Sequence, residues 1–405
     1  MKKIVFTAAI LVAITMSCTK NSDNTPLKPV QLNLTLKQAN IVASADTFAF
    51  EMFRHINNSK GSDNVIFSPL SISYALSMTA NGANGSTRDS ILKALGIEDL
   101  NIDDLNKSYK DLTSALLGVD SRVNIEIANS IWENKYYPAK QTFKDILASY
   151  YYATSDAVDF GDPATVDLVN NWISNHTNGL IKNMVDKLGS DDIMLLINAI
   201  YFKGKWQVQF DTKNTTSRSF TLPSASSVDV PTMYNEDTFK AYKGEKEGII
   251  ELPYGQGNYV MDIILPSGNE AYSLTSSGFN SLLSQMQERK VKLYLPKFKF
   301  GYKIGLNDIL KEMGMGIAFS DSADFSNLAD QLQMQISRVL HQAFIQTDEE
   351  GTEAAAATIV EIIVTSVGPN DPLIFNIDHQ FLYVIREVTT NSILFMGEVT
   401  DPTKQ

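Results

Sequence analysis

The sequence predicts one large globular domain that mixes helices and strands. Of its 405 residues, 44% are hydrophobic and 20% are charged, enough apolar mass for a sizeable core. No linker rich in Pro, Ser or Gly, no block of like charge and no repeat interrupts residues 36–400. Helical apolar spacing in one stretch, and strand-like runs in two others, predict both kinds of element. We therefore expect a single domain over residues 36–405.

Residues 1–17 have the features of a secretory signal. Lys2 and Lys3 precede an apolar run over residues 4–16, and this order is typical of a signal peptide. The run is too short to cross a bilayer as a mature helix. We expect a secreted protein, extracellular or periplasmic.

Cys18 follows this run directly and is the only cysteine in the chain. Disulfide bonds and thiolate metal sites are therefore excluded. The position resembles the lipidated cysteine of a bacterial lipobox, although Thr15 stands where that motif usually has Leu. A lipid on Cys18 would anchor a bacterial lipoprotein in the outer membrane, with the polar residues 18–35, including Pro26 and Pro29, as a tether. An ordinary signal peptide followed by an unmodified cysteine is the alternative.

The stretch NVIFSPLSISYALSMTANGANGSTRDSILKALG, residues 64–96, predicts two helices. Apolar residues follow helical spacing from about Ser71, and a break rich in Gly and Asn covers residues 81–85. Ser86 then opens the second helix, and Asp89 completes a capping box with it. Further along, INAIYFKGKW, residues 197–206, predicts a buried strand that ends in a glycine turn and a tryptophan.

The stretch DEEGTEAAAATIVEIIVTSVGPNDP, residues 348–372, admits four local structures. Ala354–Ala357 favour a helix, but the run is too short to be stable alone in water. Thr358–Val364 favour a strand. A flexible linker would carry Gly and Ser rather than so many β-branched residues, and an ordinary surface loop is the fourth possibility.

Alternation decides between these structures. One face is small or apolar throughout, and the other carries every charge after Gly351. An alternation of period two with one clean face is typical of a half-buried strand. We therefore predict that this stretch can become a strand, although its alanine half would make a weak one unaided. The clean face comprises Thr352, Ala354, Ala356, Thr358, Val360, Ile362 and Val364.

The remaining patterns exclude several function classes. A net charge of −12 argues against a nucleic-acid partner. The chain has neither a G-x-S-x-G elbow nor an H-E-x-x-H motif, and its four histidines are scattered. The Gly-x-Gly pairs at 255–257 and 314–316 lack the third glycine of a nucleotide loop and are interpreted as turns. We expect no enzyme, no cofactor and no metal, and membrane contact only through a lipid on Cys18.

Four stretches together resemble the signature sequences of the serpins, the serine protease inhibitors. They are residues 64–96, residues 197–206, HQAFIQTDEEGTEAAAAT at 341–358 and FNIDHQFLYVIREVTTNSILFMGEV at 375–399. The similarity covers about residues 36–402. One departure is Gln380, where the family usually has Pro, Ser or Thr, and we interpret it as a local change in a turn before a buried strand.

The resemblance implies the α+β serpin fold, with three β-sheets, about nine helices and an exposed reactive-centre loop near residues 349–372. It also implies suicide-substrate inhibition. A protease cleaves the loop and forms an acyl-enzyme, and the loop then inserts into the main sheet and distorts the protease. The alternative is a non-inhibitory serpin that acts as a binding or carrier protein. A glycan-binding or hydrolytic surface lipoprotein would also fit the signal and tether. In each case we expect a monomer.

The family's usual count places the scissile bond between Thr365 and Ser366, with cleavage after Ile363, Val364 or Val367 as alternatives. These residues suit elastase-like or subtilisin-like serine proteases, and a papain-like cysteine protease is the competing target. No Arg or Lys lies between Gly351 and Pro372, which argues against a trypsin-like target. The hinge that enters the sheet first would comprise Glu350, Gly351, Thr352, Glu353, Ala354, Ala355, Ala356, Ala357 and Thr358.

Two further regions follow from the resemblance. Trp206 matches the breach, where insertion begins, with ordinary core packing as the alternative. A polar cluster beneath the main sheet matches the shutter, where strands must part. A buried histidine is more often a satisfied core residue, but both roles require a hydrogen-bonded cluster. The shutter residues are Ser68, Ser71, Asn198 and His341.

Overall fold

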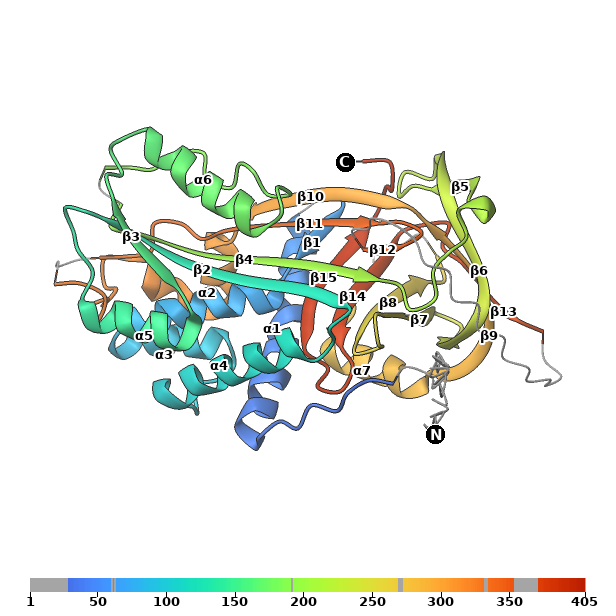
Figure 1. Ribbon diagram of the computed structural model, residues 1–405, viewed down its shortest axis with the longest axis horizontal. Helices are drawn as coiled ribbons and strands as arrows, with labels where there is room; N and C mark the ends of the chain where they lie inside the picture. The colour runs from blue at the N-terminus through green and yellow to red at the C-terminus, as the bar shows by residue number, and fades with distance from the viewer. Residues whose placement is uncertain are drawn as a thin grey trace, which may run out of the picture.

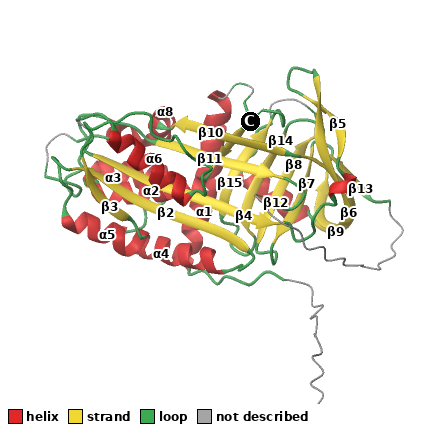
Figure 2. Cartoon of the chain, turned by 45° about the horizontal axis from the view of Figure 1, so that its top comes forward, coloured by secondary structure: helices red, strands yellow, loops and turns green. Residues whose placement is uncertain are grey.

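Two hydrogen-bonded β-sheets organise the fold (Figure 1). The computed structural model describes residues 28–59, 61, 63–190, 192–268, 272–330, 334–352 and 371–404. Helices α2, α3 and α5 gather at one end of the molecule, and strands β5, β6, β9 and β13 gather at the other (Figures 1 and 2).

The six-stranded sheet runs along the length of the molecule in the order β10-β11-β12-β4-β2-β3. Its strands are β2 (Val123–Asn134), β3 (Thr154–Val158), β4 (Met194–Lys205), β10 (Phe298–Gly305), β11 (Leu340–Thr347) and β12 (Gly351–Thr352). β2 and β4 pair antiparallel over almost their whole length. By contrast, β12 supplies only two residues between β11 and β4, and no other described residues pair those two strands.

The nine-stranded sheet has the order β1-β15-β14-β8-β7-β6-β9-β13, with β5 paired to β6. Its strands are β1 (Val65–Phe67), β5 (Thr216–Thr221), β6 (Ser227–Lys243), β7 (Glu247–Tyr254), β8 (Tyr259–Pro266), β9 (Gln287–Pro296), β13 (Leu373–Asn376), β14 (Phe381–Glu387) and β15 (Ile393–Val399). The resemblance implies three sheets, whereas hydrogen bonding joins the strands into two. The reason is that β6 continues without a break from the group around β9 to residues 241–243, which pair with β7.

The described residues form eight α-helices and three shorter helical turns, close to the nine helices implied by the resemblance. The helices are α1 (Leu36–Ser59), α2 (Pro69–Gly82), α3 (Gly85–Ala94), α4 (Ile102–Gly118), α5 (Gln141–Tyr151), α6 (Ala164–His176), α7 (Ser276–Gln285) and α8 (Asn307–Leu310), and the turns are η1 (Thr212–Asn214), η2 (Lys311–Met315) and η3 (Gly316–Phe319).

The two helices expected in residues 64–96 are confirmed, but their starts differ from the prediction. α2 begins at Pro69, and the Ser68 side chain caps it by accepting from Ser71 N–H at 3.1 Å. The capping box predicted for the second helix is wrong. α3 already starts at Gly85, whose φ of +49° suits glycine, and the Asn84 N–H instead donates to the carbonyl of Asp324.

The six-stranded sheet is covered along one face and only in part on the other, where alternate residues of β10 and of the start of β2 are exposed. α2 contacts β4 and β15 and lies in the main core between the two sheets. α6 contacts β2 and β4 from the opposite side. A second, smaller apolar cluster lies under α6 and contains Trp132, Phe160, Ile173 and Ile197. A strand added to this sheet would therefore be buried on its inner face and partly covered on its outer face.

The N-terminal end of the described chain lies along the body. The side-chain amide of Asn258 exchanges two 2.8 Å hydrogen bonds with the backbone of Val30, and Leu32 N–H donates to Thr389 Oγ1. Cys18 and the signal lie outside the described residues. Within the described ranges, no helix has the length and apolar character needed to span a bilayer.

Candidate functional site

β12 occupies the top of a slot between β4 and β11. Gly351 pairs with Lys205 and Thr352 with Gly204, both antiparallel, and Thr352 also pairs with Thr347 of β11. The backbones approach so closely that a Cβ on Gly351 would lie 2.1 Å from the carbonyl oxygen of Gly204. Only glycine fits there. Two residues of the predicted hinge, Gly351 and Thr352, are therefore paired within the sheet.

Trp206, which was predicted to mark the breach, and Tyr254 hold these residues from one side. Trp206 stacks on Tyr254, with ring centroids 4.4 Å apart and an interplanar angle of 13°. Trp206 N–H donates to Glu350 O at 2.8 Å, and its indole N–H donates to Asp348 O at 2.9 Å. The hydroxyls of Tyr254 and Thr352 share a 2.7 Å hydrogen bond. Trp206 thus contacts the hinge rather than packing only as a core residue.

Thr352 faces into the molecule, as the alternation predicts. Its side chain is buried at 4% exposure. Burial also raises the pKa of its partner Tyr254, so both hydroxyls stay neutral.

A charged pair ties the chain just before the hinge. Glu349 accepts hydrogen bonds from Lys297 Nζ at 2.6 Å and from Thr215 Oγ1 at 2.8 Å. Burial alone would raise the pKa of Glu349, but these hydrogen bonds outweigh it and hold the pKa below its ordinary value. The carboxylate is therefore charged when it holds the hinge.

The four predicted shutter residues lie together beneath β4 and β11. Ser68 N–H donates to His341 Nε2 at 3.0 Å, and Ser71 Oγ donates to Asn198 Oδ1. Asn198 Nδ2 in turn donates to Asn129 Oδ1 at 2.6 Å. The cluster thus ties α2 to β11, β4 and β2 at one level of the sheet.

Burial fixes the protonation of His341. The ring is 4% exposed, and burial lowers its pKa from 6.5 to about 4. A neutral ring is required, because Nε2 accepts a hydrogen bond from the backbone of Ser68. The predicted shutter cluster is therefore assembled with an uncharged histidine at neutral pH.

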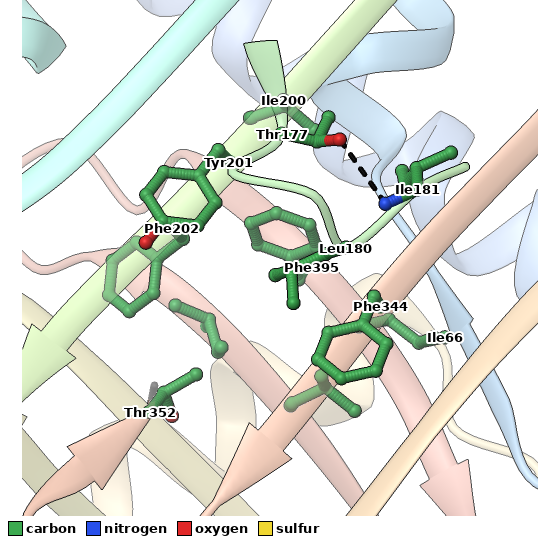
Figure 3. A pocket seen from close by; sticks show the side chains of 12 residues that line it. Ile66, Thr177, Leu180, Ile181, Ile200, Tyr201, Phe202, Phe344, Thr352 and Phe395 are labelled. Carbon is green, nitrogen blue, oxygen red and sulfur yellow. Dashed lines mark hydrogen bonds between the residues drawn. The ribbon is translucent and has the colours of Figure 1, made fainter. Parts of the chain in front are cut away.

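Below β12 the slot is narrow and then widens. A first cavity, of about 20 Å³, is lined by Ile200 and Phe202 of β4 and by Ile345 of β11 (Figure 3). A second cavity, of about 630 Å³, is lined by residues 193–198 on one side and 334–341 on the other. The two lie in series along the path that a strand between β4 and β11 would take.

Comparison with known proteins agrees with this architecture. The family model described as Serpin (serine protease inhibitor) matches residues 43–402. The chain belongs to the serpin family. This serpin is 34% identical to Iripin-2 of Ixodes ricinus, over 90% of this chain and 94% of that protein.

Solved structures show the same fold. The thermophilic serpin Tengpin in its native state superposes with a TM-score of 0.81 at 33% identity, covering 94% of this chain and 98% of that one. Human thyroxine-binding globulin superposes with a TM-score of 0.83 at 27% identity, covering 91% and 100%. The fold implied by the sequence is confirmed.

Several predicted site residues fall outside the described part of this serpin: Glu353 to Thr358 of the hinge, and Ile363, Val364, Thr365, Ser366 and Val367 around the reactive bond. Within the described part, no three His, Cys, Asp or Glu side chains lie close enough to hold a metal ion. Tyr254, Asn129 and the Glu349–Lys297 pair were not predicted. Their partners are far away in sequence, and a single chain gives no signal for such contacts.

Replacing Gly351 with alanine should drive the hinge out of the sheet. The added Cβ meets backbone rather than a flexible side chain, so the strain should weaken local packing by about 1–3 kcal/mol. We expect the Trp206 amide, which donates to Glu350, to exchange with deuterium about ten- to a hundredfold faster. Gly305→Ala on β10 is the matched control, because nothing lies within 4 Å of its Cβ. Equal exchange in both variants would refute the close packing of β12.

Acid should weaken this serpin through His341. The unfolded chain takes up a proton near pH 6.5 and the folded chain only near pH 4. The unfolded state therefore binds more protons between these values, and up to about 3 kcal/mol is lost as the pH falls through this window. Burial raises the pKa of Asp46 and Asp262, which act in the opposite direction. The measurement is therefore the difference in urea midpoint between wild type and His341→Gln from pH 7.5 to pH 4.5. A difference that does not change with pH would contradict the burial of a neutral ring.

Proposed function

We propose that this serpin inhibits an extracellular protease by inserting its cleaved loop between β4 and β11. The observation that carries the proposal is the pairing of β12, which already starts that strand at Gly351 and Thr352. In an antiparallel ladder, each residue further along the loop faces the previous residue of β4 and of β11. If the ladder continued from β12, each later residue of the loop would therefore have a defined partner on β4 and on β11.

Continued without a bulge, this register brings the inward residues of the loop to matching surroundings. Ala354 would lie between Phe202 and Ile345, which line the 20 Å³ cavity. Only a small side chain fits so little space. Thr358 would lie between Asn198 and His341, so a hydroxyl would reach the polar shutter.

The larger side chains would come next, where the slot is wide. Val360 would lie beside Leu196, and Ile362 beside Met194, both of which line the 630 Å³ cavity. Burying these two residues and Val364 contributes about 5–9 kcal/mol at roughly 1.5–3 kcal/mol each. That gain is comparable with the whole stability of a typical domain, so the uncleaved form would be held by a kinetic barrier.

Charge agrees with the same register. The residues of the loop that would face outward include Glu353 and Glu361, the two glutamates after Gly351. Glu353 would face Lys203 of β4, and Glu361 would face Arg338, just before β11. Both pairs join opposite charges, and cross-strand pairs of that kind are stabilising.

The partner we propose is an elastase-like or subtilisin-like serine protease, or a papain-like cysteine protease, cleaving next to Thr365. The assignment is supported by the aliphatic and small residues around that bond. We further propose that the chain is secreted and anchored by a lipid on Cys18, on the basis of its N-terminal sequence.

Cutting the loop should make the protein much harder to unfold. A gain of about 5–9 kcal/mol corresponds to a rise in melting temperature of about 6–12 °C for a domain of this size. The measurement is the melting temperature by circular dichroism before and after brief proteolysis in the loop. Mass spectrometry should confirm a single cut between residues 352 and 371.

A second candidate is a binding or carrier protein, favoured by the likeness to thyroxine-binding globulin. Such a protein would be cut without becoming more stable. It would also form no protease complex that survives boiling in detergent. Those two results together would overturn the inhibitory proposal.

Thr352→Arg should convert the inhibitor into a substrate. The Thr352 side chain is buried against Tyr254, and burying a guanidinium there costs several kcal/mol unless it escapes to water. Loop insertion should then become slower than deacylation of the acyl-enzyme. The amount of serpin consumed per protease inhibited should therefore rise at least about tenfold. Thr352→Ser, which keeps the hydroxyl, is the control. An unchanged stoichiometry in the arginine variant would show that this position is not buried during inhibition.

A further inference from the structure

One segment, residues 177–190, closes the front of the slot; we call it the cover segment. Leu180 and Ile181 line the narrow cavity (Figure 3). Met184 and Leu188 line the wide one. Ile181 and Met184 are buried. The outward side chains of any strand inserted between β4 and β11 would therefore meet this segment.

The cover segment is fastened to the β4 side of the slot through α6. Asn170 of α6 exchanges two hydrogen bonds with the backbone of Val185, at 2.7 and 3.0 Å. Asn178 Nδ2 also donates to the hydroxyl of Tyr201 on β4, at 3.4 Å. These contacts are neutral and belong to the side of the sheet that carries α6.

Two cations fasten the same segment to the opposite side. Lys303 Nζ, on β10, donates to Asp186 Oδ2 at 2.8 Å and to Asn183 O at 3.2 Å. The guanidinium of Arg338, just before β11, donates to the carbonyl of Lys187 and lies 4.0 Å from Asp192 Oδ2. The hydrogen bond from Lys303 holds the pKa of Asp186 below its ordinary value.

The cover segment thus spans a gap whose two sides have to accept a new strand. Neighbouring strands lie about 4.8 Å apart, so an inserted strand sets β4 and β11 at about twice that spacing along its whole length. Hydrogen bonds weaken steeply once they are stretched by a few tenths of an ångström beyond about 3.2 Å. The contacts on the two sides of the cover segment cannot all persist during insertion.

We infer that Lys303 and Arg338 form an electrostatic latch that holds the cover segment across the slot and slows insertion of the cleaved loop. The inference rests on the proposed function. The cations are the side that opens, because the Asp186 carboxylate, which Lys303 holds, is 72% exposed and accessible to salt. Arg338 holds the segment through the carbonyl of Lys187, and its contact with Asp192 lies just beyond the segment, whereas Asn170 on the opposite side is buried. Salt screens exposed charges and leaves buried amide pairs unaffected.

The test measures the rate of insertion directly. The intact protein is mixed rapidly with protease, and the change in tryptophan fluorescence is followed, since Trp206 lies beside the hinge. At saturating protease the limiting rate no longer depends on association, and since all variants carry the same loop and the same cleavage step, a difference between them reports insertion. We expect the double variant Lys303→Gln/Arg338→Gln to insert about three- to tenfold faster than wild type at low salt, as fits the loss of two exposed charge-assisted contacts. Each single variant should lie between the two.

Salt and a charge-matched control separate the latch from a general effect of charge. Raising NaCl to about 0.5 M should speed the wild type toward the rate of the double variant and leave the variant unchanged. The control variant Lys299→Gln/Arg289→Gln also replaces one lysine and one arginine, so it changes the net charge by the same amount. Lys299 lies on β10 near Phe344, and Arg289 lies on β9. This control should insert at the wild-type rate.

Each failure has a distinct signature. If nicked wild type becomes heat-stable but the double variant inserts no faster, or if the wild-type rate ignores salt, the latch is refuted and the inhibitory proposal stands. If nicked wild type gains no stability, the proposed function fails and the latch fails with it. The melting temperature of each intact variant shows that it is folded before the comparison is made.

Discussion

The constraint on which this structure depends is a strand position between β4 and β11 that the described residues fill only at its top, through β12. Both strands have their full complement of neighbours on one side, β2 for β4 and β10 for β11. On the other side, β12 provides two residues of pairing. Unpaired backbone groups inside a sheet are costly, and apolar side chains facing a cavity lose packing contacts. On the inhibitory proposal, the sheet would favour the continuation of β12 as a full strand, and the rest of the fold would determine when that strand can enter.

Two polar or aromatic clusters hold the slot at its two ends, and they do so with contacts that can be exchanged. At the top, Tyr254 bonds the hydroxyl of Thr352, and Trp206 bonds the backbone before it. Further down, His341 accepts from Ser68 while Asn198 accepts from Ser71. Hydrogen bonds of this kind contribute only about 1 kcal/mol net each. They are sufficient to position the strands and weak enough to rearrange when a larger apolar gain is available.

How far the sequence could predict this arrangement depended on whether a contact is local. The alternation over residues 351–364 places Thr352 facing inward, because period two belongs to a single strand and needs no partner to be recognised. The shutter residues and Trp206 were predicted only from the resemblance to the serpins. The capping box at Ser86 failed because the glycine before it takes a positive φ and starts the helix earlier. Tyr254 and the cover segment were missed, since both act on residues that only the topology brings near them.

Arg338 belongs to the latch and would also contact the inserted loop. A latch of this kind can slow insertion without lowering the stability of the inserted form. Arg338 now donates to the cover segment. In the register set by β12, the same guanidinium would face Glu361 of the inserted strand. Opening the latch would then replace one charge-assisted contact with another of similar strength. The contact of Arg338 with the cover segment is lost in the transition state, before the pair with Glu361 forms. The inserted product therefore does not bear this loss. A contact of this kind slows a reaction without weakening its outcome, as a kinetically trapped protein requires.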